Sequence, residues 1–143
     1  MEIIKFISEG MADILNAEQM ERLQNVCDTV LSQYEIVRRP TDQERTQKVN
    51  ADLLNLFLSA KKIEGCSEKT IHYYASTIEK LLAELAKQVA EIDTNDIRRY
   101  LAKQQETRNV SKVTIDNLRR IFSSFFAWLE DEDYIVKSPV RRI

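Results

Sequence analysis

The sequence predicts an all-α protein in which a four-helix bundle follows an N-terminal helical hairpin. The chain of 143 residues has only two glycines and two prolines, too few for the turns of a strand-rich fold. Apolar residues recur every three or four positions and nowhere alternate convincingly with polar ones. Side chains that favour helix N-termini stand directly before these periodic segments. Together these three observations favour helices throughout.

The first part of the chain is expected to form a hairpin of two helices. Apolar residues recur at helical spacing before and after Asn16, and Gln19 completes the pattern of a capping box three positions later. A linker with a proline follows, and proline disfavours helix in the residue before it. The predicted domains are therefore residues 1–40, a hairpin extension, and residues 41–143, the bundle.

Four further helices are predicted after the linker. The first ends at Gly65, because glycine suits the left-handed conformation that commonly closes a helix. The other three begin after Ser67, after Asp93 or Thr94, and after Ser111, all good N-cap residues. The core-facing residues that the spacing predicts are Leu53, Leu54, Phe57, Leu58, Ile71, Tyr74, Ala75, Ile78, Leu81, Leu82, Leu85, Ile97, Tyr100, Leu101, Leu118, Ile121, Phe122, Phe125 and Leu129.

No pattern in the sequence favours an enzyme. His72 is the only histidine, so a metal site or a histidine-based triad lacks partners. Gly10 and Gly65 stand alone and form no phosphate-binding loop. Cys27 and Cys66 fit no metal-ligand spacing. The sequence therefore predicts no catalytic residue, no metal and no cofactor.

The cysteine content and the hydropathy indicate the compartment. Two thiols do not make a disulfide framework, and the longest apolar runs are much shorter than a membrane span. The start of the chain lacks the pattern of a signal peptide. We therefore expect a cytoplasmic protein with reduced cysteines and no membrane partner.

The charge distribution bears on nucleic-acid binding. A net charge of −2 argues mildly against it, because most such domains are basic. However, residues 1–48 carry six basic against nine acidic side chains, whereas residues 49–143 carry fifteen against fourteen. Four of those fourteen acids are consecutive, from Glu130 to Asp133, where they read as a solvated end of a helix. Since local patches decide whether a surface attracts phosphate, the net charge does not exclude DNA.

Two predicted helices begin with the same pattern, serine and, three positions later, threonine, with a lysine between them. Hydroxyls, a lysine and free backbone N–H groups at the positive end of a helix suit a phosphate group, although ordinary N-capping explains the same residues. The exposed sides of both helices continue with polar residues that commonly contact phosphates and base edges, or that simply face solvent. The residues in question are Ser67, Lys69, Thr70, Tyr73, Ser76 and Lys80 on one helix, and Ser111, Lys112, Thr114, Asn117, Arg120 and Ser124 on the other.

The C-terminal residues form a basic, proline-marked segment that we expect to be extended. Lys137, Arg141 and Arg142 can cross a DNA backbone there, or the segment is only a linker. Arg119, by contrast, lies on the flank of its helix and can pair with Asp116. The aromatic residues of that helix, Phe122, Phe125, Phe126 and Trp128, have the spacing of a core rather than of a base-stacking surface.

Three motifs in a fixed order along residues 50–143 resemble a known family. One helix opens with Ser-x-x-Thr-x-x-x-Tyr, the next carries Asp-Ile-x-x-Tyr-Leu, and the last combines Ser-x-x-Thr with Phe-Phe-x-Trp-Leu. This stretch resembles the SAM-like core-binding domain of tyrosine recombinases and phage-type integrases. Ser138 stands where the family has asparagine, and Asp133 where glycine often ends the helix. The matching residues are Ser67, Thr70, Tyr74, Asp96, Ile97, Tyr100, Leu101, Ser111, Thr114, Leu118, Arg119, Phe125, Phe126, Trp128, Leu129, Ile135 and Pro139.

The resemblance implies a domain that forms half of a C-shaped clamp around DNA, with its second and fourth helices facing the major groove. In family members a catalytic domain follows, and this chain ends where that domain should begin. We therefore expect the DNA-binding part of a site-specific recombinase of a mobile element, without strand-exchange activity of its own. The implied partner is a double-stranded recombination half-site, with self-association on DNA.

The resulting hypothesis assigns a role to each exposed residue. Lys69, Thr70, Lys112, Thr114 and Arg120 would hold the DNA backbone, with Lys80, Lys137, Arg141 and Arg142 adding positive charge, while Tyr73, Asn117 and Ser124 would reach toward base edges. The alternative is a helical protein-interaction module that uses the acidic hairpin and never binds DNA. A free-standing enzyme is the least favoured interpretation.

Overall fold

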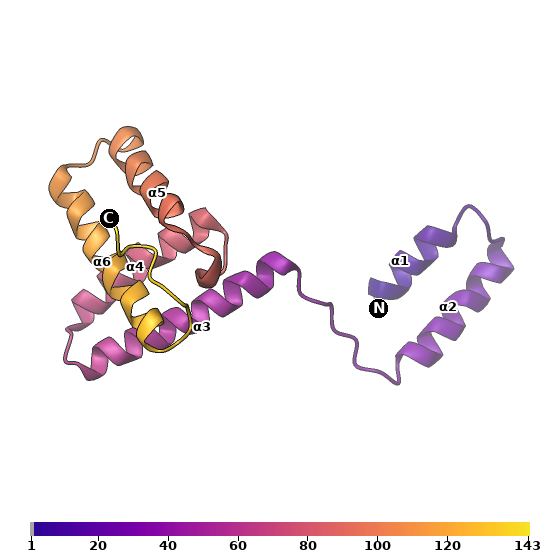
Figure 1. The fold of residues 1–143 in the computed structure, drawn as a ribbon. Helices are drawn as coiled ribbons and strands as arrows, with labels where there is room; N and C mark the ends of the chain where they lie inside the picture. The colour runs from indigo at the N-terminus through magenta and orange to yellow at the C-terminus, as the bar shows by residue number, and fades with distance from the viewer. Residues whose placement is uncertain (1) are drawn as a thin grey trace. The chain divides into compact units, whose positions relative to one another are not determined.

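The computed structural model describes residues 2–143, and this part of the chain contains six α-helices, one short 3₁₀-helix and no β-strand (Figure 1). The predicted all-α class is confirmed. The chain divides into two compact units, residues 1–39 and 40–143. The helices are α1 (Glu2–Met11), α2 (Ala17–Leu31), α3 (Asp42–Ile63), α4 (Glu68–Leu85), α5 (Thr94–Thr107) and α6 (Lys112–Asp131), with η1 (Val89–Glu91) between α4 and α5.

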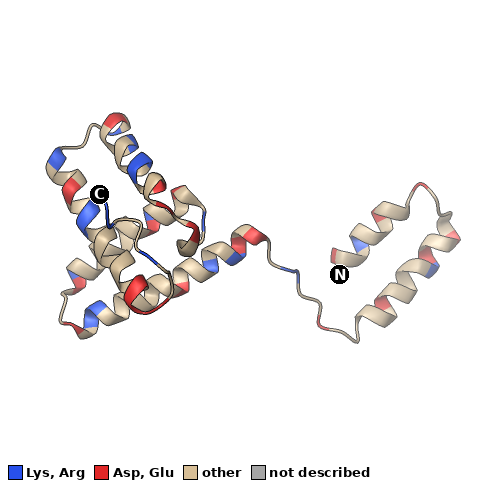
Figure 2. Ribbon diagram, viewed as in Figure 1, with Lys and Arg blue, Asp and Glu red and all other residues tan. Residues whose placement is uncertain are grey.

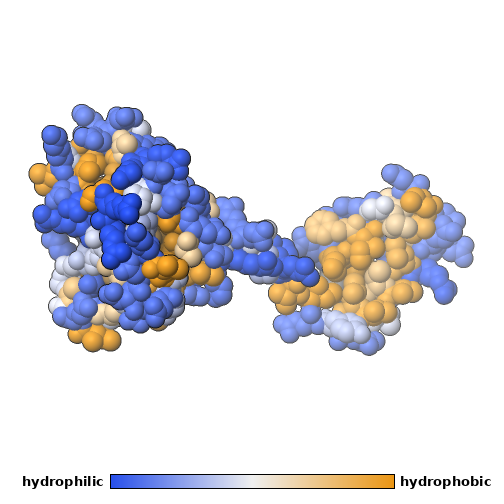
Figure 3. Space-filling view, in the orientation of Figure 1, coloured by the Kyte–Doolittle hydropathy of each residue, from blue (hydrophilic) through white to orange (hydrophobic). Residues whose placement is uncertain are grey.

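The first unit is a hairpin of α1 and α2 that leaves much apolar surface in contact with solvent. Asn16 and Gln19 form the capping box that the sequence predicts at the start of α2. Neither helix contains a buried residue, and Phe6 remains 62% exposed. Figure 3 shows apolar residues gathered on the visible side of this hairpin.

In the second unit, helix boundaries follow the caps. The Ser67 hydroxyl caps α4, the Ser111 hydroxyl caps α6, and the Asp93 carboxylate caps α5 in a capping box. Gly65 has a φ of +95° directly after α3, as predicted for the glycine that ends this helix. These starts and the stop are confirmed.

The core of the second unit is aromatic at its centre. Phe57 of α3 packs edge-on against Phe125 of α6, with ring centroids 5.2 Å apart. Phe122 packs in the same manner against Tyr100 of α5, at 5.7 Å. Phe126 is fully buried too, so the core interpretation of these aromatic residues is confirmed. Seven of the predicted core residues lie only partly buried at its edge: Leu53, Leu58, Ile71, Tyr74, Ala75, Leu85 and Leu118.

The expectation of an extended C-terminal segment is wrong. After α6 the chain folds back through turns, in which the backbone N–H of Ser138 donates to the Glu130 carboxylate at 2.7 Å. The segment folds back because the apolar side chains of Ile135 and Val140 enter the core and Ile143 packs against it. Lys137, Arg141 and Arg142 are therefore exposed cations on an anchored segment.

Within residues 2–143, no helix is both long enough and apolar enough to cross a bilayer.

Candidate nucleic-acid interface

The N-termini of α4 and α6 have the same geometry. The Ser67 hydroxyl accepts a hydrogen bond from the Thr70 backbone N–H at 3.2 Å and donates to the Thr70 hydroxyl at 3.0 Å. In α6 the Ser111 hydroxyl accepts from the Thr114 backbone N–H at 3.2 Å, and the two hydroxyls lie 3.1 Å apart. The serines therefore act as ordinary caps, and the groups left to meet an anion are the lysines and the first backbone N–H groups of each helix.

Four of the predicted residues of α4 form one stripe away from the core, whereas Thr70 is half-buried and lies outside it. Lys69, Tyr73, Ser76 and Lys80 are spaced i, i+4, i+7 and i+11, which places them on one side of a helix. Both lysines are exposed, and Tyr73 keeps 49% of its surface in solvent. Because most large aromatic side chains of this unit are buried, an exposed tyrosine on a polar stripe is available for contact with a ligand.

In the stripe on α6, Asn117, Arg120 and Ser124 repeat the spacing of Tyr73, Ser76 and Lys80, but the exposed Val113 stands where α4 has Lys69. Asn117 and Arg120 are exposed, while Ser124 and Thr114 are half-buried beside them. Since α4 and α6 pack against one another, both stripes belong to one rigid bundle. The stripes present amide, hydroxyl, phenol and cationic side chains, which are the groups that proteins use to contact DNA.

Arg119 and Arg120 share one carboxylate. The Arg119 guanidinium donates to Asp116 at 2.8 Å, as the sequence suggested, and Arg120 Nε lies 3.0 Å from the other carboxylate oxygen. The hydrogen bond from Arg119 lowers the pKa of Asp116, and the charge of Arg120 lowers it further. Asp116 thus holds Arg120 in place on the exposed side of α6.

The C-terminal cations occupy a different place. Lys137 and Arg142 line a shallow hollow with Asp93 and Thr94 at the start of α5. None of the predicted residues of α4 or α6 lines this hollow. The structure therefore groups the α4 and α6 residues on one bundle and sets Lys137 and Arg142 beside α5.

A groove between α4 and α5 was not recognised from the sequence. Its lining includes Lys80 of α4 together with Lys103 and Arg108 from the end of α5. Figure 2 shows basic residues along α5 and the first half of α6. The sequence contained only a weak indication of this groove. Lys80 is distant in sequence from Lys103 and Arg108, and only the packing of two helices brings them together.

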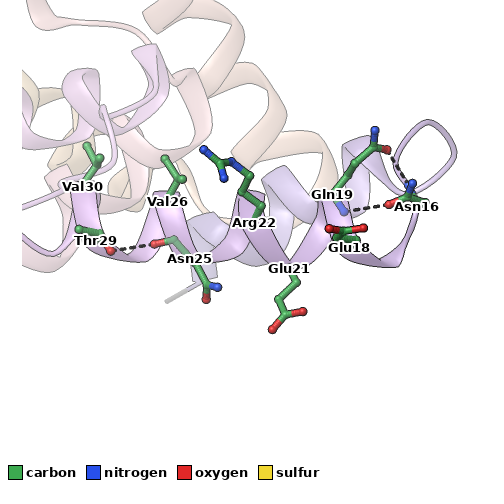
Figure 4. Close-up of a pocket in the computed structure, with 9 residues that line it drawn as sticks. All are labelled: Asn16, Glu18, Gln19, Glu21, Arg22, Asn25, Val26, Thr29 and Val30. Carbon is green, nitrogen blue, oxygen red and sulfur yellow. Dashed lines mark hydrogen bonds between the residues drawn. The ribbon is translucent and has the colours of Figure 1, made fainter.

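The hollow drawn in Figure 4 lies along α2, in the hairpin unit. Its lining contains no histidine or cysteine, and its only charged side chains are Glu18, Glu21 and Arg22. Among residues 2–143 no group of three or more histidine, cysteine, aspartate or glutamate side chains is placed to hold a metal ion. Neither observation supports a catalytic site in this hollow.

A comparison with protein families identifies the second unit. Residues 53–135 match the family of the phage integrase N-terminal SAM-like domain. The chain belongs to this family. No curated protein and no solved structure matches the chain.

The SAM-like region defined by this match contains both polar stripes. It begins within α3, includes α4, α5 and α6, and ends at Ile135. The resemblance seen in residues 50–143 is therefore confirmed, and the all-helical bundle fits it. The hairpin and the cations at residues 137–142 lie outside the matched region.

Proposed function

We propose that the SAM-like unit binds double-stranded DNA as the core-binding part of a site-specific recombinase of a mobile element. It would hold one half-site through the exposed stripes of α4 and α6 and would not catalyse strand exchange itself. One observation carries the proposal: two packed helices of an integrase-family domain begin with the same Ser-x-x-Thr cap and then place three polar residues at equivalent positions, Tyr73, Ser76 and Lys80 on α4 and Asn117, Arg120 and Ser124 on α6.

Within the two stripes, some residues contact the DNA backbone and others contact the bases. Lys69 and Lys112 sit in the first turns, where cations and backbone N–H groups together favour phosphate. Thr70 and Thr114 add hydroxyls beside them, and Arg120 adds a guanidinium. Further along the helices, Tyr73, Asn117 and Ser124 reach base edges.

The charge distribution is compatible with this interface. Figure 2 shows acidic residues in the hairpin and at the end of α6, while the first turn of α4 holds one acidic residue, Glu68, and the first turn of α6 holds none. The net charge of −2 thus sums an acidic extension and a bundle that is close to neutral. A local basic surface is sufficient to attract the DNA backbone.

The first prediction concerns the DNA backbone. Lys112→Ala should weaken binding to a 30-base-pair duplex of mixed sequence and flatten the slope of log affinity against log salt by about one unit, because one phosphate contact is lost. Fluorescence anisotropy of the labelled duplex between low and moderate salt measures both effects. Lys48→Ala is the matched control, since Lys48 is an exposed lysine of α3 that lies on neither stripe.

The second prediction concerns sequence specificity. Asn117→Ala should cost about 1–3 kcal/mol of discrimination at one position of the preferred site, because a bidentate amide contact to a base is lost. Selection of binding sites from a random duplex library, with both proteins in parallel, measures this. A selected motif that is unchanged in the variant would place Asn117 outside the base-reading surface.

A protein-interaction role for the hairpin is the second candidate, and one observation favours it. No residue of α1 or α2 is buried, and large apolar side chains such as Phe6 and Ile14 are mostly exposed. An open apolar surface of this kind commonly marks a contact with another protein. Absence of any duplex binding at low salt would favour this role over the DNA interface.

A further inference from the structure

The groove between α4 and α5 continues the α4 stripe toward the start of α6. Lys80, the last residue of that stripe, lines one wall, and Lys103 and Arg108 line the other. Gln104 and Thr107 add an amide and a hydroxyl between them. The groove therefore combines three cations with neutral hydrogen-bonding groups, the chemistry that binds phosphate esters.

One acid opposes these cations. Glu84 of α4 forms an ion pair with Lys103 across the groove. Burial raises the pKa of the Tyr100 hydroxyl and the negative charge of Glu84 raises it further, while the positive charge of Arg108 lowers it. No other acidic residue lines the groove, so its lining carries a net positive charge.

The position of Arg108 connects the groove to α6. Arg108 ends α5, with its backbone N–H donating to Gln104, and Asn109 then turns the chain with a φ of +48°. Ser111, which caps α6, follows two residues later. The groove thus lies between the α4 stripe and the first turn of α6.

We infer that the α4–α5 groove binds the phosphate backbone of the same DNA duplex, with Lys103 and Arg108 as contacts that lie outside both stripes. This inference rests on the proposed DNA binding and extends it from α4 and α6 to α5. Lys80 then serves both the stripe and the groove. Glu84 limits the affinity, because it neutralises Lys103 and repels phosphate.

The test uses the full chain and the same 30-base-pair duplex of mixed sequence. Arg108→Ala and Lys103→Ala should each weaken binding about three- to tenfold and flatten the salt slope by about one unit. Glu84→Gln should do the opposite and tighten binding, because it removes the only acid of the groove and frees Lys103. Arg108→Lys and Lys103→Arg keep the charge and should retain near-wild-type affinity.

The controls separate this inference from the proposed function. Lys48→Ala removes an exposed lysine elsewhere on the unit and should leave affinity unchanged. One outcome is that Lys112→Ala weakens binding while Arg108→Ala, Lys103→Ala and Glu84→Gln all bind as the wild type does. In that case the groove is not a phosphate site, and the proposed interface on the α4 and α6 stripes still stands. If Lys112→Ala also has no effect, the proposed interface itself fails. Equal losses in the charge-keeping variants would also overturn the inference, because they would indicate a structural effect.

Discussion

At the residue scale, the Asp96 carboxylate joins three parts of the second unit. It accepts hydrogen bonds from the Asp93 backbone N–H at 3.1 Å, from Lys87 at 3.0 Å and from Arg99 at 2.7 Å. Its side chain is only 4% exposed. Burial alone raises the pKa of Asp96, but these hydrogen bonds and the charge of Lys87 outweigh burial and lower the pKa to about 2.

This pKa predicts how stability depends on pH. Because the folded pKa lies below the ordinary value of 3.8, the stabilisation is complete above about pH 4 and is lost as the pH falls toward 2. Asp96→Asn should cost about 2 kcal/mol at pH 7, since hydrogen bonds to charged groups are lost. Urea unfolding of both proteins at several pH values should show the difference shrinking below pH 4. A difference that stays constant down to pH 2 would contradict this role.

A second buried side chain holds the segment after α4. The Asn50 amide donates to the Lys87 carbonyl at 2.7 Å and accepts from the Val89 backbone N–H at 3.1 Å. Asn50→Ala leaves both backbone groups without this partner and should lower the free energy of unfolding by about 2–3 kcal/mol. Asn55→Ala, at an exposed position of the same helix, is the control and should change it by less than about 0.5 kcal/mol. Equal effects of the two substitutions would contradict the account.

At the element scale, the helix starts were predictable because each carries a local capping signal. Ser67 and Ser111 cap the helices that the sequence assigned to them, and of the two candidates Asp93 and Thr94 it is Asp93 that caps α5. The 3₁₀-helix η1 was not predicted, since the turn before it is made by Ala86 with a φ of +52° and no glycine marks it. The C-terminal segment was predicted wrongly because the burial of Val140 depends on tertiary packing, which no local pattern records.

Ala86 gives a prediction about helix α4. Its left-handed backbone is unfavourable for an L-residue with a side chain, and its side chain is exposed. Ala86→Gly should therefore stabilise the protein by about 1 kcal/mol and raise Tm by about 3 °C in thermal unfolding. The matched reverse change, Gly65→Ala, should destabilise by a similar amount, because a Cβ there meets no atom within 4 Å and only the φ of +95° is strained. A lower Tm for Ala86→Gly would contradict this explanation.

At the scale of the whole molecule, the two units differ in how well they can fold alone. The second unit has a buried aromatic core, whereas none of the residues described in the hairpin, 2–39, is buried and its helices have only 10 and 15 residues. Helices of this length are marginal in water without tertiary packing. We propose that residues 41–143 are the autonomous domain and that residues 1–40 are an extension.

Truncation tests this division. A fragment of residues 41–143 should melt cooperatively near the Tm of the full chain and bind duplex DNA at least as tightly, because it keeps both stripes and loses an acidic segment. Circular dichroism and anisotropy measure the two properties. Loss of cooperative melting in the fragment would show that the hairpin completes the fold.

The candidate site was accessible to sequence reasoning only in part. The two stripes could be predicted, because each lies on one helix with regular spacing and an N-cap serine. The α4–α5 groove could not, because Lys80 and Arg108 meet only through the packing of two helices. The ion pairs of Asp96 were missed for the same reason, since Lys87 lies outside α5.

The central claim is that α4 and α6 form a DNA-binding surface, and an NMR titration of the full chain tests it most directly. The ¹H–¹⁵N spectrum is followed while a duplex carrying a candidate attachment site is added at low and at moderate salt. The account predicts shifts concentrated at residues 67–80 and 111–124 that fade as salt rises, since phosphate contacts release counterions. Absence of shifts there at low salt, or shifts confined to the hairpin, would contradict it.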